Sequence, residues 1–142
     1  MAAWKLLSWN VNGIRAVSKK GFGAWVAKEA PDVLCIQETK AHEVQLGPEI
    51  TDLQGYTSYW AEAEKKGYSG VAVYARHEPI SVQKGFGEDR FDSEGRTLVL
   101  EYPYFTLFNV YFPNGKKNKE RLQYKMDFYE AILDCWEALR KE

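Results

Sequence analysis

The sequence predicts an α/β fold with one mixed sheet and flanking helices. A strand, a helix and a second strand follow one another over residues 4–9, 22–29 and 31–40. This order is typical of a βαβ unit, in which the two strands lie parallel. Short apolar segments separated by turn residues come next, and an amphipathic segment ends the sequence. No linker, repeat or low-complexity tract interrupts it, so residues 1–142 are expected to form one structural unit.

The first part of the chain alternates buried strands with a helix. The strand at 4–9 ends at 10–13, where Asn and Gly supply turn chemistry. Apolar residues at helical spacing predict a helix over 22–29, which Pro31 ends. The apolar run that follows predicts the second strand within 31–40.

The second strand ends in a carboxylate and a lysine, and this is the most informative feature of the chain. Glu38 and Lys40 are two residues apart, so an extended strand places both on one face, where a metal ion and a phosphate could bind. Asn10 ends the first strand, and the carboxyl ends of parallel strands meet at one edge of a sheet. From the residues alone, a binding site and two ordinary solvated strand ends both remain open.

The later part of the chain predicts more strands and a final helix. Segment 41–53 reads as a loop or a weak helix. Five strands are then expected, at 56–61, 70–75, 81–86, 97–102 and 105–112. Apolar residues over 119–139 recur at steps of three and four, which predicts an amphipathic helix that covers a sheet. The residues of that stripe are Leu122, Met126, Tyr129, Leu133, Trp136 and Leu139.

The composition excludes several classes of protein. A net charge of −1 gives no general attraction to nucleic acid, so any phosphate binding has to be local. Cys35 and Cys135 lie among apolar neighbours, which favours buried thiols and a reducing cytoplasm over a disulfide. No leader pattern and no apolar run of about 18 residues is present, so neither secretion nor membrane insertion is expected. We therefore expect a cytoplasmic protein, nucleoid-associated if it is bacterial.

Five segments of the chain combine strand ends with polar residues. They are Ser8-Trp9-Asn10-Val11-Asn12-Gly13, Ile36-Gln37-Glu38-Thr39-Lys40, Gly67-Tyr68-Ser69-Gly70-Val71, Asp92-Ser93-Glu94-Gly95-Arg96 and Asn109-Val110-Tyr111-Phe112-Pro113-Asn114. In the same order, they resemble segments of the exonuclease III family of apurinic/apyrimidinic (AP) endonucleases, within the metal-dependent endonuclease/exonuclease/phosphatase superfamily. The resemblance runs from about Leu6 to the C-terminal helix. It implies half of a DNase I-like four-layer α/β sandwich, and a metal-dependent DNA phosphodiesterase of base-excision repair.

The resemblance assigns roles to individual residues. Glu38 and Asn10 correspond to metal-site residues, with Mg²⁺ as the expected ion and Mn²⁺ as an alternative. Tyr111 and Asn114 correspond to catalytic residues near the scissile phosphate. From the residues alone, a turn residue is the favoured reading of Asn10, and a core tyrosine at a strand end is the favoured reading of Tyr111. The alternative for Asn114 is a residue of the turn after a proline.

A second group of residues fits contacts with the DNA backbone. It consists of Lys40, Tyr68, Arg96 and Asn12. Exposed, solvating roles compete for Lys40, Tyr68 and Arg96. The expected DNA partner is a duplex with abasic sites or 3' ends, cleaved as an AP endonuclease or a 3'-5' exodeoxyribonuclease.

Two motifs of the family are missing from this sequence. The family has an Asp-x-Asn motif and a later Asp-His pair, and neither occurs here. Loss of a general base typically costs about 100- to 10,000-fold in rate, so the chain is expected to be inactive alone. One apolar face of the sheet is also expected to lack a cover. We consider, in this order, a truncated form, one half of a split protein completed by a second polypeptide, and self-association.

Two other functions stay open. A remnant of this kind could act as a DNA-binding or protein-interaction module without catalysis. Related groups in the superfamily hydrolyse small phosphoesters, although the segments at 9–13 and 31–40 match the DNA-repair branch better.

Overall fold

The computed structural model describes residues 3–141, which fall into two compact units that divide between Tyr111 and Phe112. The first unit contains β1 (Leu6–Asn10), α1 (Ile14–Ser18), α2 (Phe22–Glu29), β2 (Val33–Gln37), the 3-10 helix η1 (Glu43–Gln45), α3 (Pro48–Thr51), β3 (Thr57–Ala61), β4 (Val71–Ala75), β5 (Ser81–Lys84), α4 (Asp89–Asp92), β6 (Thr97–Tyr102) and β7 (Phe105–Val110). The second contains α5 (Lys119–Arg140). Within the described residues, no helix is long and apolar enough to cross a membrane.

The first unit is built on a mixed four-stranded sheet in the order β1-β2-β4-β3. Strands β1 and β2 are parallel, as the βαβ pattern predicted, and β4 is antiparallel to both of its neighbours. The predicted α/β class with a mixed sheet and flanking helices is confirmed.

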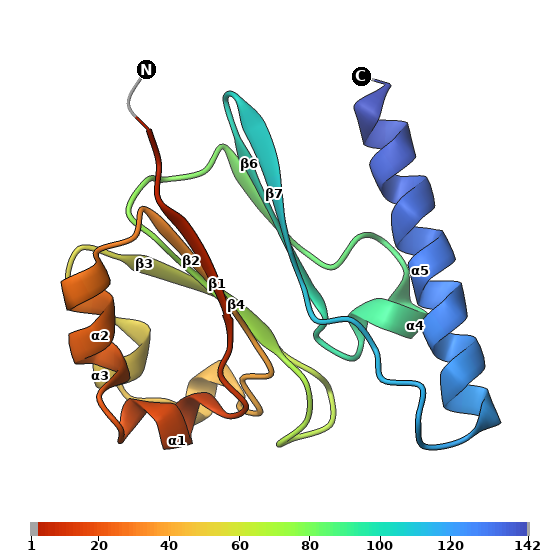
Figure 1. The fold of residues 1–142 in the computed structure, drawn as a ribbon, viewed down its shortest axis with the longest axis horizontal. Helices are drawn as coiled ribbons and strands as arrows, with labels where there is room; N and C mark the ends of the chain where they lie inside the picture. The colour runs from red at the N-terminus through yellow and green to blue at the C-terminus, as the bar shows by residue number, and fades with distance from the viewer. Residues whose placement is uncertain (1–2, 142) are drawn as a thin grey trace. The chain divides into compact units, whose positions relative to one another are not determined.

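Helices α1, α2 and α3 lie on one face of this sheet (Figure 1). Side chains alternate along a strand, so Leu34 and Ile36 of β2 face the helices while Val33 and Cys35 face the other way. Both sets are buried, which explains why β2 reads as a continuous apolar run.

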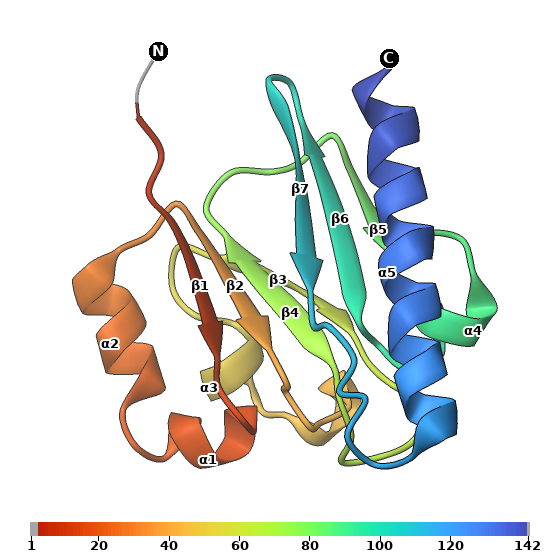
Figure 2. The same cartoon turned by 45° about the vertical axis from the view of Figure 1, so that its right-hand side comes forward.

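A second sheet, absent from the sequence prediction, covers the other face. Strands β5, β6 and β7 form an antiparallel sheet, whose Leu98 and Leu100 pack in one cluster with Val33 and Val73 of the mixed sheet. Figure 2 shows this second sheet next to the mixed sheet, on the side away from α1, α2 and α3. The prediction of a bare face on the mixed sheet is therefore wrong. Strand periodicity gives the direction of side chains but does not tell which sheet a strand joins.

The predicted strands and the long helix are all present, and two short helices were missed. Helices α1 and α4 have five and four residues, too few to show a helical period. Helix α5 begins at Lys119 and is capped by Asn118, whose side chain accepts a hydrogen bond of 2.8 Å from the Arg121 amide. The apolar stripe predicted for α5 is wrong. Its buried residues are Tyr124, Phe128 and Ile132, because apolar residues occupy more than one stripe of this helix.

Candidate active site

The site begins where β1 and β2 end, side by side. The two strands are paired in register from Leu6 with Val33 to Asn10 with Gln37, so their carboxyl ends coincide. Both strands point the same way in Figure 2. Asn10 therefore lies next to the residue that follows Gln37, which is Glu38. This confirms the expected meeting of Asn10 and Glu38 at one edge of the sheet.

Glu38 is the centre of a polar network. The Asn10 amide nitrogen donates to one Glu38 carboxylate oxygen at 3.3 Å. The Lys40 ammonium lies 3.3 Å from the other oxygen and also donates to Asn12 Oδ1 at 2.6 Å. Four of the predicted site residues thus form one connected group, in which a positive and a negative charge compensate each other.

The backbone around this network is strained. Asn12, Glu38, Lys40 and Ser69 all have a positive φ, between 49° and 59°, which costs a non-glycine residue roughly 1–2 kcal/mol. Hydrogen bonds hold them there, including Gly13 N to Glu38 O at 2.7 Å and Lys40 N to Ser69 O at 2.8 Å. Strain of this kind gathers at functional sites.

This strain corrects one prediction. Strand β2 ends at Gln37, so Glu38 and Lys40 do not share a face of an extended strand. Their side chains meet because the left-handed backbone at both residues folds the loop back on itself.

Tyr111, at the end of the second sheet, contributes a side chain to the site. It follows β7, and its amide donates to the Arg96 carbonyl at 2.8 Å. Burial, the negative charge of Glu38 and a hydrogen bond with the Glu38 carboxylate raise the pKa of Tyr111 above its usual value. The phenol therefore keeps its proton at neutral pH and is available as a hydrogen-bond donor.

Arg96 lies behind Tyr111 and Tyr68, and only 2% of its side chain is exposed. Its guanidinium donates to the Tyr111 carbonyl at 3.0 Å, to the Tyr68 hydroxyl at 2.8 Å and to the Glu94 carboxylate at 2.9 Å. It also lies 5.1 Å from the centre of the Tyr111 ring. Direct contact of Arg96 with DNA stays a prediction, and its burial favours a role in holding the two tyrosines.

Asn114 belongs to the second unit, after the boundary at Phe112. Its side-chain oxygen accepts a hydrogen bond of 2.8 Å from the Lys116 amide, which is the turn role that the sequence left open. Its catalytic role stays a prediction. His42 is only 17% exposed, and its ring nitrogen Nδ1 lies 2.8 Å from a Glu62 carboxylate oxygen.

Sequence reasoning missed two polar residues beside the site. Asn109 is buried on β7, and Gln37 ends β2 with its amide bonded to Asn109. An amide inside the apolar segment 105–112 is the signal that could have identified Asn109, because a polar side chain in a buried strand needs partners.

The donor set fits a single hard cation. Among residues 3–141, no cluster of three or more His, Cys, Asp or Glu side chains could hold a metal. Mg²⁺ commonly takes only one or two carboxylates and completes its octahedral shell with water and phosphate oxygens. Glu38, with the Asn10 amide beside it, satisfies that minimum.

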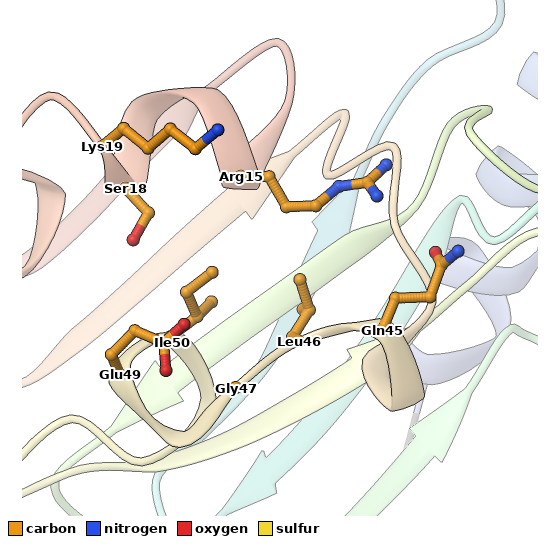
Figure 3. A pocket seen from close by; sticks show the side chains of 8 residues that line it. All are labelled: Arg15, Ser18, Lys19, Gln45, Leu46, Gly47, Glu49 and Ile50. Carbon is orange, nitrogen blue, oxygen red and sulfur yellow. The ribbon is translucent and has the colours of Figure 1, made fainter.

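A separate pocket of about 380 Å³ lies between α1 and the segment of η1 and α3 (Figure 3). Its lining residues are Arg15, Ser18, Lys19, Gln45, Leu46, Gly47, Glu49 and Ile50. None of the predicted site residues lines it. Arg15 links the pocket to the site, because its guanidinium donates to the Lys40 carbonyl at 3.1 Å.

Comparisons with known proteins identify the family of this chain. Residues 7–138 match the model of the endonuclease/exonuclease/phosphatase family. The chain is 43% identical over 130 residues to an exodeoxyribonuclease of Bacillus subtilis. The aligned residues cover 91% of this chain and 50% of that protein. It is 46% identical over 126 residues to the DNA repair nuclease APEX1 of Danio rerio, covering 87% of this chain and 41% of that protein.

Solved structures show the same fold. An AP endonuclease from Archaeoglobus fulgidus matches with a TM-score of 0.78 and 28% identity, over 92% of this chain and 49% of that one. A 3' phosphatase from Neisseria, bound to a product DNA hairpin, matches with a TM-score of 0.79 and 26% identity, over 93% and 51%. The chain thus spans about half the length of these relatives and has the corresponding part of their DNase I-like fold. It belongs to the metal-dependent endonuclease/exonuclease/phosphatase family.

Proposed function

We propose that this chain supplies the metal- and phosphate-binding part of a DNA phosphodiesterase of the AP endonuclease and 3'-5' exodeoxyribonuclease type. The observation that carries the proposal is the network at Glu38, where side chains from two sheets converge on one carboxylate. The strained backbone of this network and its Glu38–Lys40 ion pair are typical of a functional site.

Each residue has a role that its geometry supports. Glu38 and Asn10 would hold the ion, with Mg²⁺ preferred and Mn²⁺ as an alternative. When bound, such an ion polarises a phosphoryl oxygen and offsets its charge. The protonated Tyr111 phenol donates to a non-bridging phosphate oxygen, and the Lys40 ammonium offsets negative charge beside it. Asn12 orients Lys40 through their 2.6 Å hydrogen bond.

The proposed substrate is duplex DNA with an abasic site or a 3' end. Support comes from relatives named for DNA repair and exodeoxyribonuclease activity, and from the relative solved with a DNA product. We propose that the protein acts in the cytoplasm, at the nucleoid if the source is bacterial, and the support is that Cys35 and Cys135 lie among apolar neighbours, which favours a reducing compartment.

We also propose that catalysis requires residues corresponding to the other half of these relatives. The support is that the chain spans about half of its relatives and contains no Asp-x-Asn or Asp-His motif. The general base and its supporting pair would come from that half.

The experiment is cleavage of an end-labelled duplex with one abasic site, in Mg²⁺. The chain is assayed alone and after addition of a separately expressed second half from a relative. We expect incision only in the mixture, and its loss in Glu38→Ala. Incision by the chain alone would refute the need for a second half, and incision by the Glu38→Ala mixture would refute the assigned site. Salt-sensitive DNA binding without incision in either case would favour the non-catalytic alternative.

A further inference from the structure

We propose that Asn109 is a positioning residue, whose side-chain amide fixes the two sheets against each other at the point where Glu38 and Tyr111 meet. The inference rests on the proposed function, because it takes Glu38 as the metal ligand and Tyr111 as the phosphate donor. The side-chain hydrogen bonds of Asn109 go to Ile36, Ala72 and Gln37, and not to Glu38 or Tyr111 themselves.

The amide of Asn109 is buried and its hydrogen bonds are made across the sandwich. The side chain lies on β7 and the residue is 2% exposed. Its nitrogen donates to the carbonyl of Ile36 at 3.1 Å and to that of Ala72 at 2.8 Å. These two residues face each other in the β2–β4 pair of the mixed sheet. Both donors of the Asn109 amide are therefore used on the opposite sheet.

The acceptor side of the same amide extends the link to β1. The Gln37 amide nitrogen donates to Asn109 Oδ1 at 2.9 Å and to the Ser8 hydroxyl at 2.9 Å. One continuous chain of hydrogen bonds thus runs from β7 to β2 and β1. We refer to Asn109, Gln37 and Ser8 as the inter-sheet clamp.

The clamp lies next to Glu38 and Tyr111, the two residues whose side chains come together in the site. Glu38 directly follows Gln37 in the chain, and Tyr111 is two residues beyond Asn109. The remaining contacts between the sheets in this cluster are largely apolar, such as Leu98 and Leu100 against Val73. Apolar contacts are non-directional, whereas hydrogen bonds have narrow limits of distance and angle. The clamp is therefore suited to setting the relative position of Glu38 and Tyr111.

Two variants and one matched control test this role in the complete chain. Asn109→Leu keeps the approximate volume and removes every hydrogen bond. Asn109→Asp keeps the shape and removes the two donors to the carbonyls. The control, Tyr74→Phe, removes another buried hydrogen bond, from the Tyr74 hydroxyl to the Ile50 carbonyl at 2.8 Å, on the helix-covered face of the mixed sheet.

Two readouts separate positioning from simple stability. The first is the nuclear Overhauser effect between the Tyr111 ring and the Glu38 side chain. The second is the affinity for Mn²⁺, measured by water-proton relaxation. We expect both Asn109 variants to lose the Overhauser effect and to bind Mn²⁺ about 10-fold more weakly, as loss of a supporting residue typically does. Tyr74→Phe should lower the denaturation midpoint and leave both readouts unchanged.

Several outcomes would decide against the proposal. Unchanged Overhauser effect and Mn²⁺ affinity in folded Asn109→Asp would overturn it, as would equal losses in Tyr74→Phe. If both Asn109 variants fail to fold, Gln37→Met takes their place with the same expectations in weaker form, because it removes the bonds to Asn109 Oδ1 and to the Ser8 hydroxyl and leaves the two bonds that Asn109 donates. Failure of the unsubstituted chain to bind Mn²⁺ would refute the proposed metal site, while the Overhauser effect would still decide on the clamp.

Discussion

Replacing Arg96 with methionine tests whether this buried guanidinium holds the site together. The substitution removes donors to Glu94, Tyr68 and the Tyr111 carbonyl, and keeps much of the side chain's volume. Breaking a buried ion pair by removing one partner costs about 3–5 kcal/mol. The Glu94 side chain is 20% exposed, so water compensates part of the loss, and we expect a decrease of about 2–3 kcal/mol in the free energy of unfolding.

The assay is equilibrium urea denaturation followed by tryptophan fluorescence, with two comparison variants. Arg140→Ala removes a pair whose side chains are 77% and 47% exposed, and it should cost less than about 0.5 kcal/mol. The double variant Arg96→Met with Glu94→Leu should recover part of the loss, because the negative charge that Arg96 compensated is then removed as well. A loss below about 1 kcal/mol for Arg96→Met, or a double variant that is worse than the single one, would refute the reasoning.

Three further predictions concern the surroundings of the site. Hydrogen bonds from the Lys5 amide and from His77 lower the pKa of Asp32 below 3.8, so its ionised form stabilises the fold above that pH and the benefit is lost as pH falls through the folded-state pKa. Asp32→Asn should therefore lower the thermal midpoint at pH 7 and have a progressively smaller effect as the solution is acidified through the folded-state pKa of Asp32, and an effect that does not change with pH would contradict this assignment. Burial raises the pKa of Cys35 to about 12, so a thiol reagent should label Cys35 only after unfolding, which mass spectrometry of tryptic peptides can follow. Gly70 has a φ of 90° and its missing Cβ would collide with the Thr39 hydroxyl, so Gly70→Ala should cost about 1–2 kcal/mol in a urea titration, and a neutral result would show that the loop has room to adjust.

The local order of strands and helices could be predicted from the sequence, and with it one part of the site. Asn10 and Glu38 come together because two parallel strands of a βαβ unit end at the same edge, a rule that follows from connection geometry. The buried strand β2 could also be predicted, because its residues are apolar on both faces and form a continuous apolar run in the sequence.

The parts that could not be predicted depend on contacts between distant segments. Lys40 reaches Glu38 only through a left-handed backbone at both residues, which the sequence pattern does not disclose. Arg96 reads as an exposed cation after a turn, yet its partners Tyr68 and Tyr111 are 28 and 15 residues away and enclose it. The second sheet was missed for a similar reason, because alternation within a strand carries no information on its partners.

Binding of Mn²⁺ to the chain, measured by electron paramagnetic resonance of the free ion, tests the central claim most directly. The site at Glu38 predicts one bound ion per chain, with binding weakened about 10-fold or more in Glu38→Gln and unchanged in Arg140→Ala. Equal Mn²⁺ affinity in the unsubstituted chain and in Glu38→Gln would contradict it, because the carboxylate on which the network converges would then hold no metal.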